Sequence, residues 1–115
     1  MIKVAYDRPN CSLRVEGHAD FAKNGGDDPV CAMVSILTYT IAQIINECAD
    51  NDRVKNAVTD FSQKGLAVLS CVPTPKNRNG VMLQMDAVCV GFLILASEYP
   101  ENIEFAWNRH ENITP

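Results

Sequence analysis

Hydrophobic and polar residues alternate along the start of the chain. From residue 2 to residue 7 every second residue is apolar, with Ile2, Val4 and Tyr6 on one side of the pattern. The alternation predicts a strand with one buried face, and residues 11–17 repeat it. A turn over residues 8–10, which contain a proline, separates the two runs. We therefore expect a β-hairpin at the N-terminal end.

The spacing of apolar residues becomes helical after Asp28. Asp28 is a favourable N-cap, and Pro29 suits the first position of a helix. Apolar residues then recur at helical spacing at positions 30, 33, 34, 37, 41, 44, 45 and 48. The pattern predicts a helix that begins at Pro29 and ends at the polar run of residues 50–52.

The pattern of two strands followed by a helix is predicted again in the rest of the chain, and one more strand follows it. Residues 54–61 and 66–72 are predicted strands joined by a turn at residues 63–65, which contain a glycine. A helix is predicted from about residue 79 to residue 98, before Pro100, and a last strand over residues 103–108. The second helix is apolar on nearly every face, so we expect it to be covered by more than its own sheet, as a subunit interface would do.

The predicted order of elements is β-β-α-β-β-α-β. Strands that pair as hairpins favour an antiparallel sheet, and two helices suffice to cover one of its faces. We expect residues 1–115 to form a single α+β domain with two layers, in which both helices pack on a mostly antiparallel sheet.

Composition narrows the class of protein. The 115 residues are 47% hydrophobic and 21% charged, with a net charge of −4, which is typical of a globular domain. A mildly acidic surface disfavours nucleic-acid phosphates, so no direct nucleic-acid partner is expected. The longest apolar stretch, residues 81–96, contains Gln84 and Asp86 and is shorter than the roughly 20 residues that span a bilayer, so no membrane partner is expected.

The cysteines indicate the redox compartment. The chain has 5 cysteines. They are widely spaced, form no Cys-x-x-Cys pair and follow no signal-peptide pattern. The distribution predicts free thiols in a reducing cytoplasm.

Cys31 is the first candidate for chemistry. It lies in the first turn of the predicted helix, where the positive end of the helix dipole favours a thiolate, the form that acts as a nucleophile. It shares a small, partly polar flank of the helix with Ser35 and Thr38. The alternative is a buried structural thiol, which is the role expected for the other cysteines, at positions 11, 48, 71 and 89.

His18 is the second candidate. It lies where the second strand ends and a loop of residues 19–27 begins, which contains Gly25 and Gly26 and has a composition typical of a mobile substrate loop. A histidine in hydrogen-bond reach of Cys31 acts as a general base. The alternative is a solvent-exposed loop histidine.

Two further polar residues, Asp28 and Ser35, are candidates to support His18 and Cys31. Asp28 caps the helix and is also a candidate to orient His18, while Ser35 either hydrogen-bonds near the thiolate or is simply a small residue. Main-chain N–H groups at the start of the helix are candidates to stabilise an oxyanion. Two ligands, His18 and Cys31, are too few for a metal site, so no metal or other cofactor is expected.

The segment VEGHADFAKNGGDDPVCAMVS resembles the signature of the ribosomal-processing cysteine protease family, Prp. The resemblance rests on Gly17-His18-Ala19, Gly26, Asp28-Pro29-Val30-Cys31-Ala32 and Ser35, and extends to residues 91–100. The loop between His18 and Cys31 is one residue longer than in the family pattern, and Pro29 replaces a branched apolar residue.

The resemblance implies a bacterial α+β homodimer whose Cys-His pair cuts after a hydrophobic or aromatic residue. Matching positions make Cys31 the nucleophile and His18 the general base, with Asp28 and Ser35 in support. The implied substrate is the N-terminal extension of a large-subunit ribosomal protein precursor, the twenty-seventh in the usual naming. The alternative is a non-enzymatic or redirected relative, of phage origin for instance, that binds or processes another protein tail.

Overall fold

A computed structural model describes residues 1–19, 22 and 26–110. The strands and helices lie where the sequence pattern predicts them, and two short 3-10 helices are added. The bounds are β1 (Ile2–Asp7), η1 (Arg8–Asn10), β2 (Ser12–Gly17), α1 (Pro29–Asp50), β3 (Val54–Asp60), β4 (Leu66–Pro73), η2 (Pro75–Asn77), α2 (Arg78–Glu98) and β5 (Ile103–Asn108).

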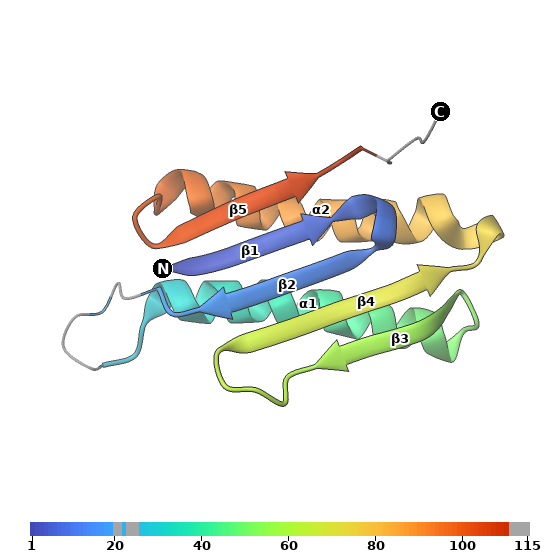
Figure 1. Cartoon of the computed structure of the whole chain (residues 1–115), viewed down its shortest axis with the longest axis horizontal. Coiled ribbons are helices and arrows are strands. Elements are labelled where there is room, and N and C mark those ends of the chain that lie inside the picture. Colours follow the sequence, from blue (N-terminus) through green and yellow to red (C-terminus); the bar gives the residue numbers. More distant parts are fainter. Residues whose placement is uncertain (20–21, 23–25, 111–115) are drawn as a thin grey trace.

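The strands form one sheet in the order β3-β4-β2-β1-β5 (Figure 1). The two hairpins and the pairing of β2 with β4 are antiparallel. β5 instead runs parallel to β1, with Ile2 opposite Ile103. The predicted α+β class with a mostly antiparallel sheet is confirmed, and the parallel edge is a feature that the hairpin pattern alone does not reveal.

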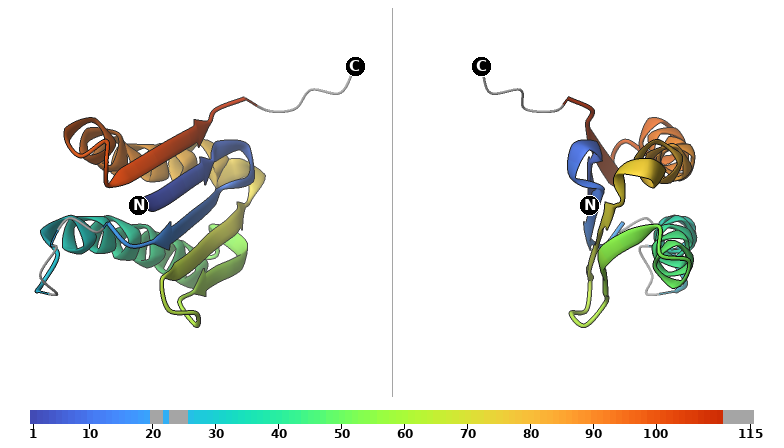
Figure 2. Two further views of the ribbon diagram at one scale, coloured as in Figure 1. Left: turned by 60° about the vertical axis from the view of Figure 1, so that its left-hand side comes forward. Right: turned by 90° about the vertical axis from the view of Figure 1, so that its right-hand side faces the viewer.

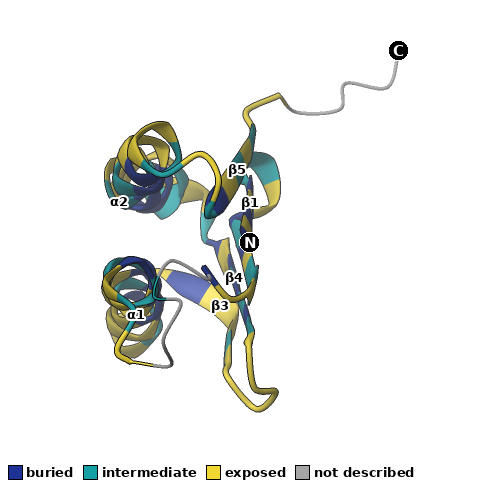
Figure 3. Ribbon diagram, turned by 90° about the vertical axis from the view of Figure 1, so that its left-hand side faces the viewer, coloured by how far each residue is buried: buried dark blue, intermediate teal, exposed yellow. Residues whose placement is uncertain are grey.

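Both helices cover the same face of the sheet, which makes the domain two-layered (Figures 2 and 3). The buried residues of the strands point toward the helices, and the alternation predicted for β1 appears as the buried positions Ile2, Val4 and Tyr6. Burying one such large side chain stabilises the fold by about 1.5–3 kcal/mol. The largest fully buried side chains include Tyr6, Phe92, Leu13, Ile41, Ile45, Leu69 and Met85.

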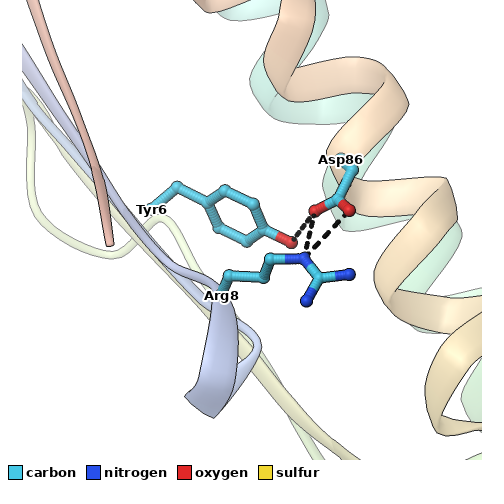
Figure 4. A network of polar contacts seen from close by, with 3 residues as sticks. All are labelled: Tyr6, Arg8 and Asp86. Atoms are coloured by element: carbon cyan, nitrogen blue, oxygen red, sulfur yellow. Dashed lines mark hydrogen bonds and ion pairs between the residues drawn. The ribbon is translucent and has the colours of Figure 1, made fainter. Parts of the chain in front are cut away.

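A polar network fixes α2 to the sheet at the end remote from Ile2 (Figure 4). The Asp86 carboxylate accepts a hydrogen bond from the Tyr6 hydroxyl at 2.9 Å and two from Arg8 Nε at 2.9 and 3.0 Å. Burial, and then the neighbouring Asp86, raise the pKa of Tyr6. The tyrosine therefore stays protonated and donates its hydrogen to the carboxylate.

The helices meet closely at Gly91. A Cβ on Gly91 would lie 2.9 Å from both terminal methyls of Leu37 in α1, so the absence of a side chain lets Leu37 pack against the α2 backbone. The glycine therefore sets the distance between the two helices at this point.

The outer face of α2 is apolar as well. Leu83, Val90, Leu93 and Ile94 are all exposed, and we call them the apolar helix face. By length and composition alone both helices are apolar enough to cross a membrane, but each uses its buried side to form the core of the domain.

Candidate active site

A cavity of about 300 Å³ opens between three elements: the end of β2, the first half of α1 and the turn between β3 and β4. His18 and Cys31 both line it, although 12 residues separate them in the sequence. Other residues of its wall are Ser35, Thr38, Tyr39, Phe61, Lys64 and Gly65. The structure thus brings the two predicted chemical groups to one concave surface, which is where ligands bind in most proteins.

Asp28 fixes the position of Cys31 in the first turn of α1. Its carboxylate accepts hydrogen bonds from the N–H groups of Val30 at 2.9 Å and Cys31 at 3.1 Å. It also accepts from the N–H of Ala22 at 3.2 Å, which connects the preceding loop to the helix. The predicted cap is confirmed, and it holds the thiol at the positive end of the helix.

This cap changes one expectation about the oxyanion. The N–H groups of Val30 and Cys31 already donate to the Asp28 side chain, and that of Ala32 donates to the Asp28 carbonyl at 3.0 Å. The start of α1 therefore has no N–H group at these three positions left to stabilise an oxyanion, contrary to the sequence-based expectation.

A different main-chain group lies at the sulfur. The N–H of Ala19 donates to Cys31 Sγ at 3.4 Å. Ala19 is buried, and its own carbonyl accepts a hydrogen bond from Asn102 Nδ2 at 2.8 Å. The neighbouring carbonyl of His18 accepts one from the Met1 nitrogen. Hydrogen bonds thus hold the main chain of residues 18 and 19 in place next to the thiol.

Two glycines shape the surroundings of His18. Gly17 has a φ of +99°, and a Cβ there would collide with the Met1 carbonyl oxygen. Its N–H donates to the Gly65 carbonyl at 2.9 Å, which ties the end of β2 to the β3–β4 turn. Gly65 has a φ of +74° and lies beside the His18 imidazole. The imidazole itself is exposed at the mouth of the cavity.

The structure describes two of the other predicted site residues, Ser35 and Gly26, but not Gly25. Ser35 lines the cavity one turn beyond Cys31. Of the predicted substrate loop, Gly26 is exposed with open space around it, whereas Gly25 lies outside the described residues.

Four of the five cysteines are buried, as predicted for structural thiols: Cys11, Cys48, Cys71 and Cys89. Burial raises the pKa of Cys48, and raises that of Cys89 to about 12. The hydrogen bond between the paired thiols Cys11 and Cys71 raises the pKa of Cys71 and lowers that of Cys11. Cys31 differs because it is only half-buried and faces the cavity.

Sequence reasoning missed the aromatic rim of the cavity. Tyr39 and Phe61 are both exposed, and their ring centroids lie 5.2 Å apart. Tyr39 follows Cys31 and Ser35 at intervals of four residues, so a helical projection places it on their flank. Phe61 and Lys64 come from the distant β3–β4 turn, and no local pattern indicates that they reach the site.

In the part of the chain that the structure describes, no group of three or more His, Cys, Asp or Glu side chains is placed to hold a metal ion. The cavity brings together a thiol and an imidazole beside an aromatic rim, and the Ala19 N–H is directed at the thiol.

Similar folds occur among solved structures. The ribosomal processing protease Prp of S. aureus with a covalently linked product peptide is 22% identical, with a TM-score of 0.65, and the match covers 93% of this chain and 99% of that one. The same protease with a substrate peptide is 17% identical, with a TM-score of 0.63, and the match covers 92% and 96%. SMU.848 of Streptococcus mutans is 21% identical, with a TM-score of 0.60, over 92% and 90%. No curated protein sequence matches the chain.

The match to a family model is broader than any local motif. The model for cysteine protease Prp matches residues 1–104, which span every strand and helix except the end of β5. The chain therefore belongs to the Prp family of cysteine proteases.

Proposed function

We propose that Cys31 is the nucleophile and His18 the general base of peptide-bond hydrolysis in this protein. The observation that carries the proposal is that both side chains line one cavity, with the Ala19 N–H directed at Cys31 Sγ. The other four cysteines are buried in the core, where a peptide has no access to them.

The reaction follows from these roles. His18 takes the proton of the Cys31 thiol, and the thiolate attacks the scissile carbonyl. The tetrahedral intermediate collapses to a thioester, while His18 returns the proton to the leaving amine. Water, deprotonated by His18, then hydrolyses the thioester and restores the free thiol.

The aromatic rim supports a preference for an apolar residue before the cut. Tyr39 and Phe61 offer exposed ring faces on the cavity wall that holds Cys31. Aromatic pairs add about 0.5–1.5 kcal/mol beyond the burial of their area. Lys64 lies on the same wall and is the only charged side chain among its described residues, which favours a peptide free of further positive charge there.

The proposed substrate is the N-terminal extension of a large-subunit ribosomal protein, the twenty-seventh in the usual naming. Support comes from the S. aureus relative, which is a ribosomal processing protease observed with substrate and product peptides. The free thiols favour the reducing cytoplasm as the place of the reaction.

We also propose that the protein acts as a homodimer through the apolar helix face. The sequence of α2 carries no charge between Asp86 and Glu98. Three exposed side chains of the apolar helix face lie in this stretch, and the fourth, Leu83, lies one turn before it. Contiguous exposed apolar residues of this kind are typical of protein–protein interfaces. A second copy would cover the face that the sheet leaves open.

The experiment is mass spectrometry of a synthetic peptide that spans the precursor's extension and the first residues of the mature protein. Wild type should make a single cut after a hydrophobic residue, and Cys31→Ala and His18→Ala should make none. His110→Ala, which changes an exposed histidine near the end of the described chain, is the matched control and should cut normally.

Two other results have distinct meanings. If the wild-type protein binds the precursor peptide without cutting it, the protein is a binding module and the proposed chemistry is wrong. Neither binding nor cleavage would mean that the enzyme is directed to another protein tail, and the assignment of the ribosomal precursor would be wrong.

A further inference from the structure

The main chain at Ala19 connects Cys31 to a residue from the far end of the sequence. The Ala19 N–H donates to Cys31 Sγ at 3.4 Å, and the carbonyl of the same residue accepts from Asn102 Nδ2 at 2.8 Å. Ala19 is 1% exposed, so bulk water does not compete well for either bond. Asn102 lies 83 positions after Ala19 in the sequence.

Asn102 is itself held in place by its own backbone. Its N–H donates to the Tyr99 carbonyl at 2.9 Å, and its carbonyl accepts from the N–H of Ile2 at 2.8 Å. These bonds fix the α2–β5 turn against the start of β1, beside the cavity wall to which Ile2 contributes. The side-chain amide therefore projects from a rigid turn rather than from a free loop.

We infer that Asn102 is a positioning residue for the nucleophile: its amide holds the Ala19 carbonyl so that the Ala19 N–H stays directed at Cys31 Sγ. The inference deepens the proposed function, because it takes Cys31 as the nucleophile. Asn102 is not among the described residues that line the cavity, and it acts through the backbone of residue 19.

The physical consequence concerns the charged form of the thiol. An N–H bond to a sulfur is stronger when the sulfur is a thiolate, because hydrogen bonds to an ionised partner are roughly twice as strong as neutral ones. A hydrogen bond to the charged form favours that form. Loss of the Asn102 amide would let the Ala19 N–H turn away from Cys31 Sγ, and the thiolate would lose a hydrogen-bond donor that stabilises it.

The test is the pH dependence of Cys31 alkylation by iodoacetamide, followed by mass spectrometry of the peptide that carries Cys31. Asn102→Asp keeps the size of the side chain but removes the donor, and Asn102→Ala removes the side chain. In both variants we expect the midpoint of the alkylation profile to move to higher pH and the rate at pH 6 to fall about tenfold, the change that corresponds to 1.4 kcal/mol.

The matched control is Asn77→Ala. Asn77 also donates from Nδ2 at 2.8 Å, to Thr74 Oγ1, at the other end of the sheet. Its loss should leave the profile of Cys31 unchanged. Circular dichroism shows whether each variant is folded, and hydrogen exchange of the Ala19 amide, which should become faster only in the Asn102 variants, reports the local change directly.

An unchanged alkylation midpoint in folded Asn102→Asp would overturn the inference, as would an equal shift in Asn77→Ala. The proposed function fails in a different way. If wild type does not cleave the precursor peptide but the midpoint still moves in Asn102→Asp, the proteolytic assignment is wrong and the positioning role remains.

Discussion

Gly65 lies against the imidazole of His18: a Cβ on this glycine would stand 3.5 Å from Nε2 and 4.0 Å from Cε1. The backbone of Gly65 has a φ of +74°, which other residues adopt at a cost. Because glycine has no Cβ, the main chain of the β3–β4 turn can approach the imidazole closely.

Gly65→Ala should lower both stability and activity. The left-handed backbone costs an L-residue about 1–2 kcal/mol, and the methyl group restricts the imidazole. Gly80→Ala is the control, because Gly80 lies in α2 with open space around it, and alanine there should stabilise the fold by about 0.5–1 kcal/mol. Urea unfolding and peptide cleavage measure the two effects, and full stability in Gly65→Ala would contradict the backbone argument.

The cysteines should react with iodoacetamide in a defined order. Cys31 should be modified first in the native protein, because it is half-buried and lines the cavity. Cys89 should lag strongly, since burial raises its pKa to about 12. Time-resolved mass spectrometry checks this order, and Cys31→Ser should remove the fast phase while leaving the slow one. A fast phase that survives this substitution would mean that another thiol is the reactive one.

Asp28→Ala should destabilise the protein by about 0.5–2 kcal/mol, the usual effect of losing an N-cap. It should also slow the alkylation of Cys31, because the uncapped first turn frays and no longer holds the thiol at the positive end of α1. Asp28→Asn is the matched variant, since asparagine caps a helix about as well as aspartate. If Asp28→Asn loses as much stability as Asp28→Ala, the carboxylate has a role beyond the cap.

The stability of the protein should fall in alkaline solution partly because of Tyr6. Its pKa is raised above the ordinary 10.0 by burial and by Asp86. Above that pH the unfolded chain releases this proton while the folded chain keeps it, so the free energy of unfolding falls as pH rises. Below the ordinary pKa of tyrosine, the stabilising contribution of the Tyr6 proton is fully present.

Tyr6→Phe should therefore show a shallower loss of stability between pH 9 and pH 11.5 in urea unfolding. Tyr39→Phe, which removes the hydroxyl of an exposed tyrosine, is the control and should follow wild type. Equal slopes for wild type and Tyr6→Phe would show that the Tyr6 proton does not contribute.

Ile94→Glu should separate the proposed dimer into chains of 12.7 kDa. Ile94 is 57% exposed on the apolar helix face, and a charge at the centre of an interface is unfavourable. Val72→Glu is the control: Val72 is also exposed, but it alternates with the buried positions of β4 and so points to the side of the sheet opposite the helices. Analytical ultracentrifugation distinguishes the two, and a wild type that sediments as a single chain would refute the homodimer.

The local elements were predictable because their causes are local. Alternation in β1 and β2, the Asp28 cap and the helical spacing after Pro29 each depend on neighbouring residues. The same holds for Cys31, whose place in the first turn of α1 follows from the cap. His18 was found because the end of a strand is visible in the pattern.

The parts that escaped prediction come from long-range pairing. Asn102 precedes β5 and Phe61 follows β3, so they reach the site only because these strands take particular places in the sheet, and hydrophobic spacing does not encode strand order. The parallel alignment of β5 with β1 is one such case, since a strand that follows a helix can pair in either direction. The oxyanion expectation failed because one side chain, Asp28, occupies two of the N–H groups.

The pairing of the first strand with the last has a consequence for the time course of folding. β5 docks on β1 with Ile103 opposite Ile2, so this contact closes a loop that contains the other three strands and both α-helices. Contacts of such sequence separation form slowly, and during synthesis they cannot form until β5 has left the ribosome. Asn102 immediately precedes β5, so a nascent chain contains His18 and Cys31 long before Asn102 can bond to the Ala19 carbonyl. The docking of β5 on β1, rather than the synthesis of His18 and Cys31, is then the folding step that completes the surroundings of the thiol.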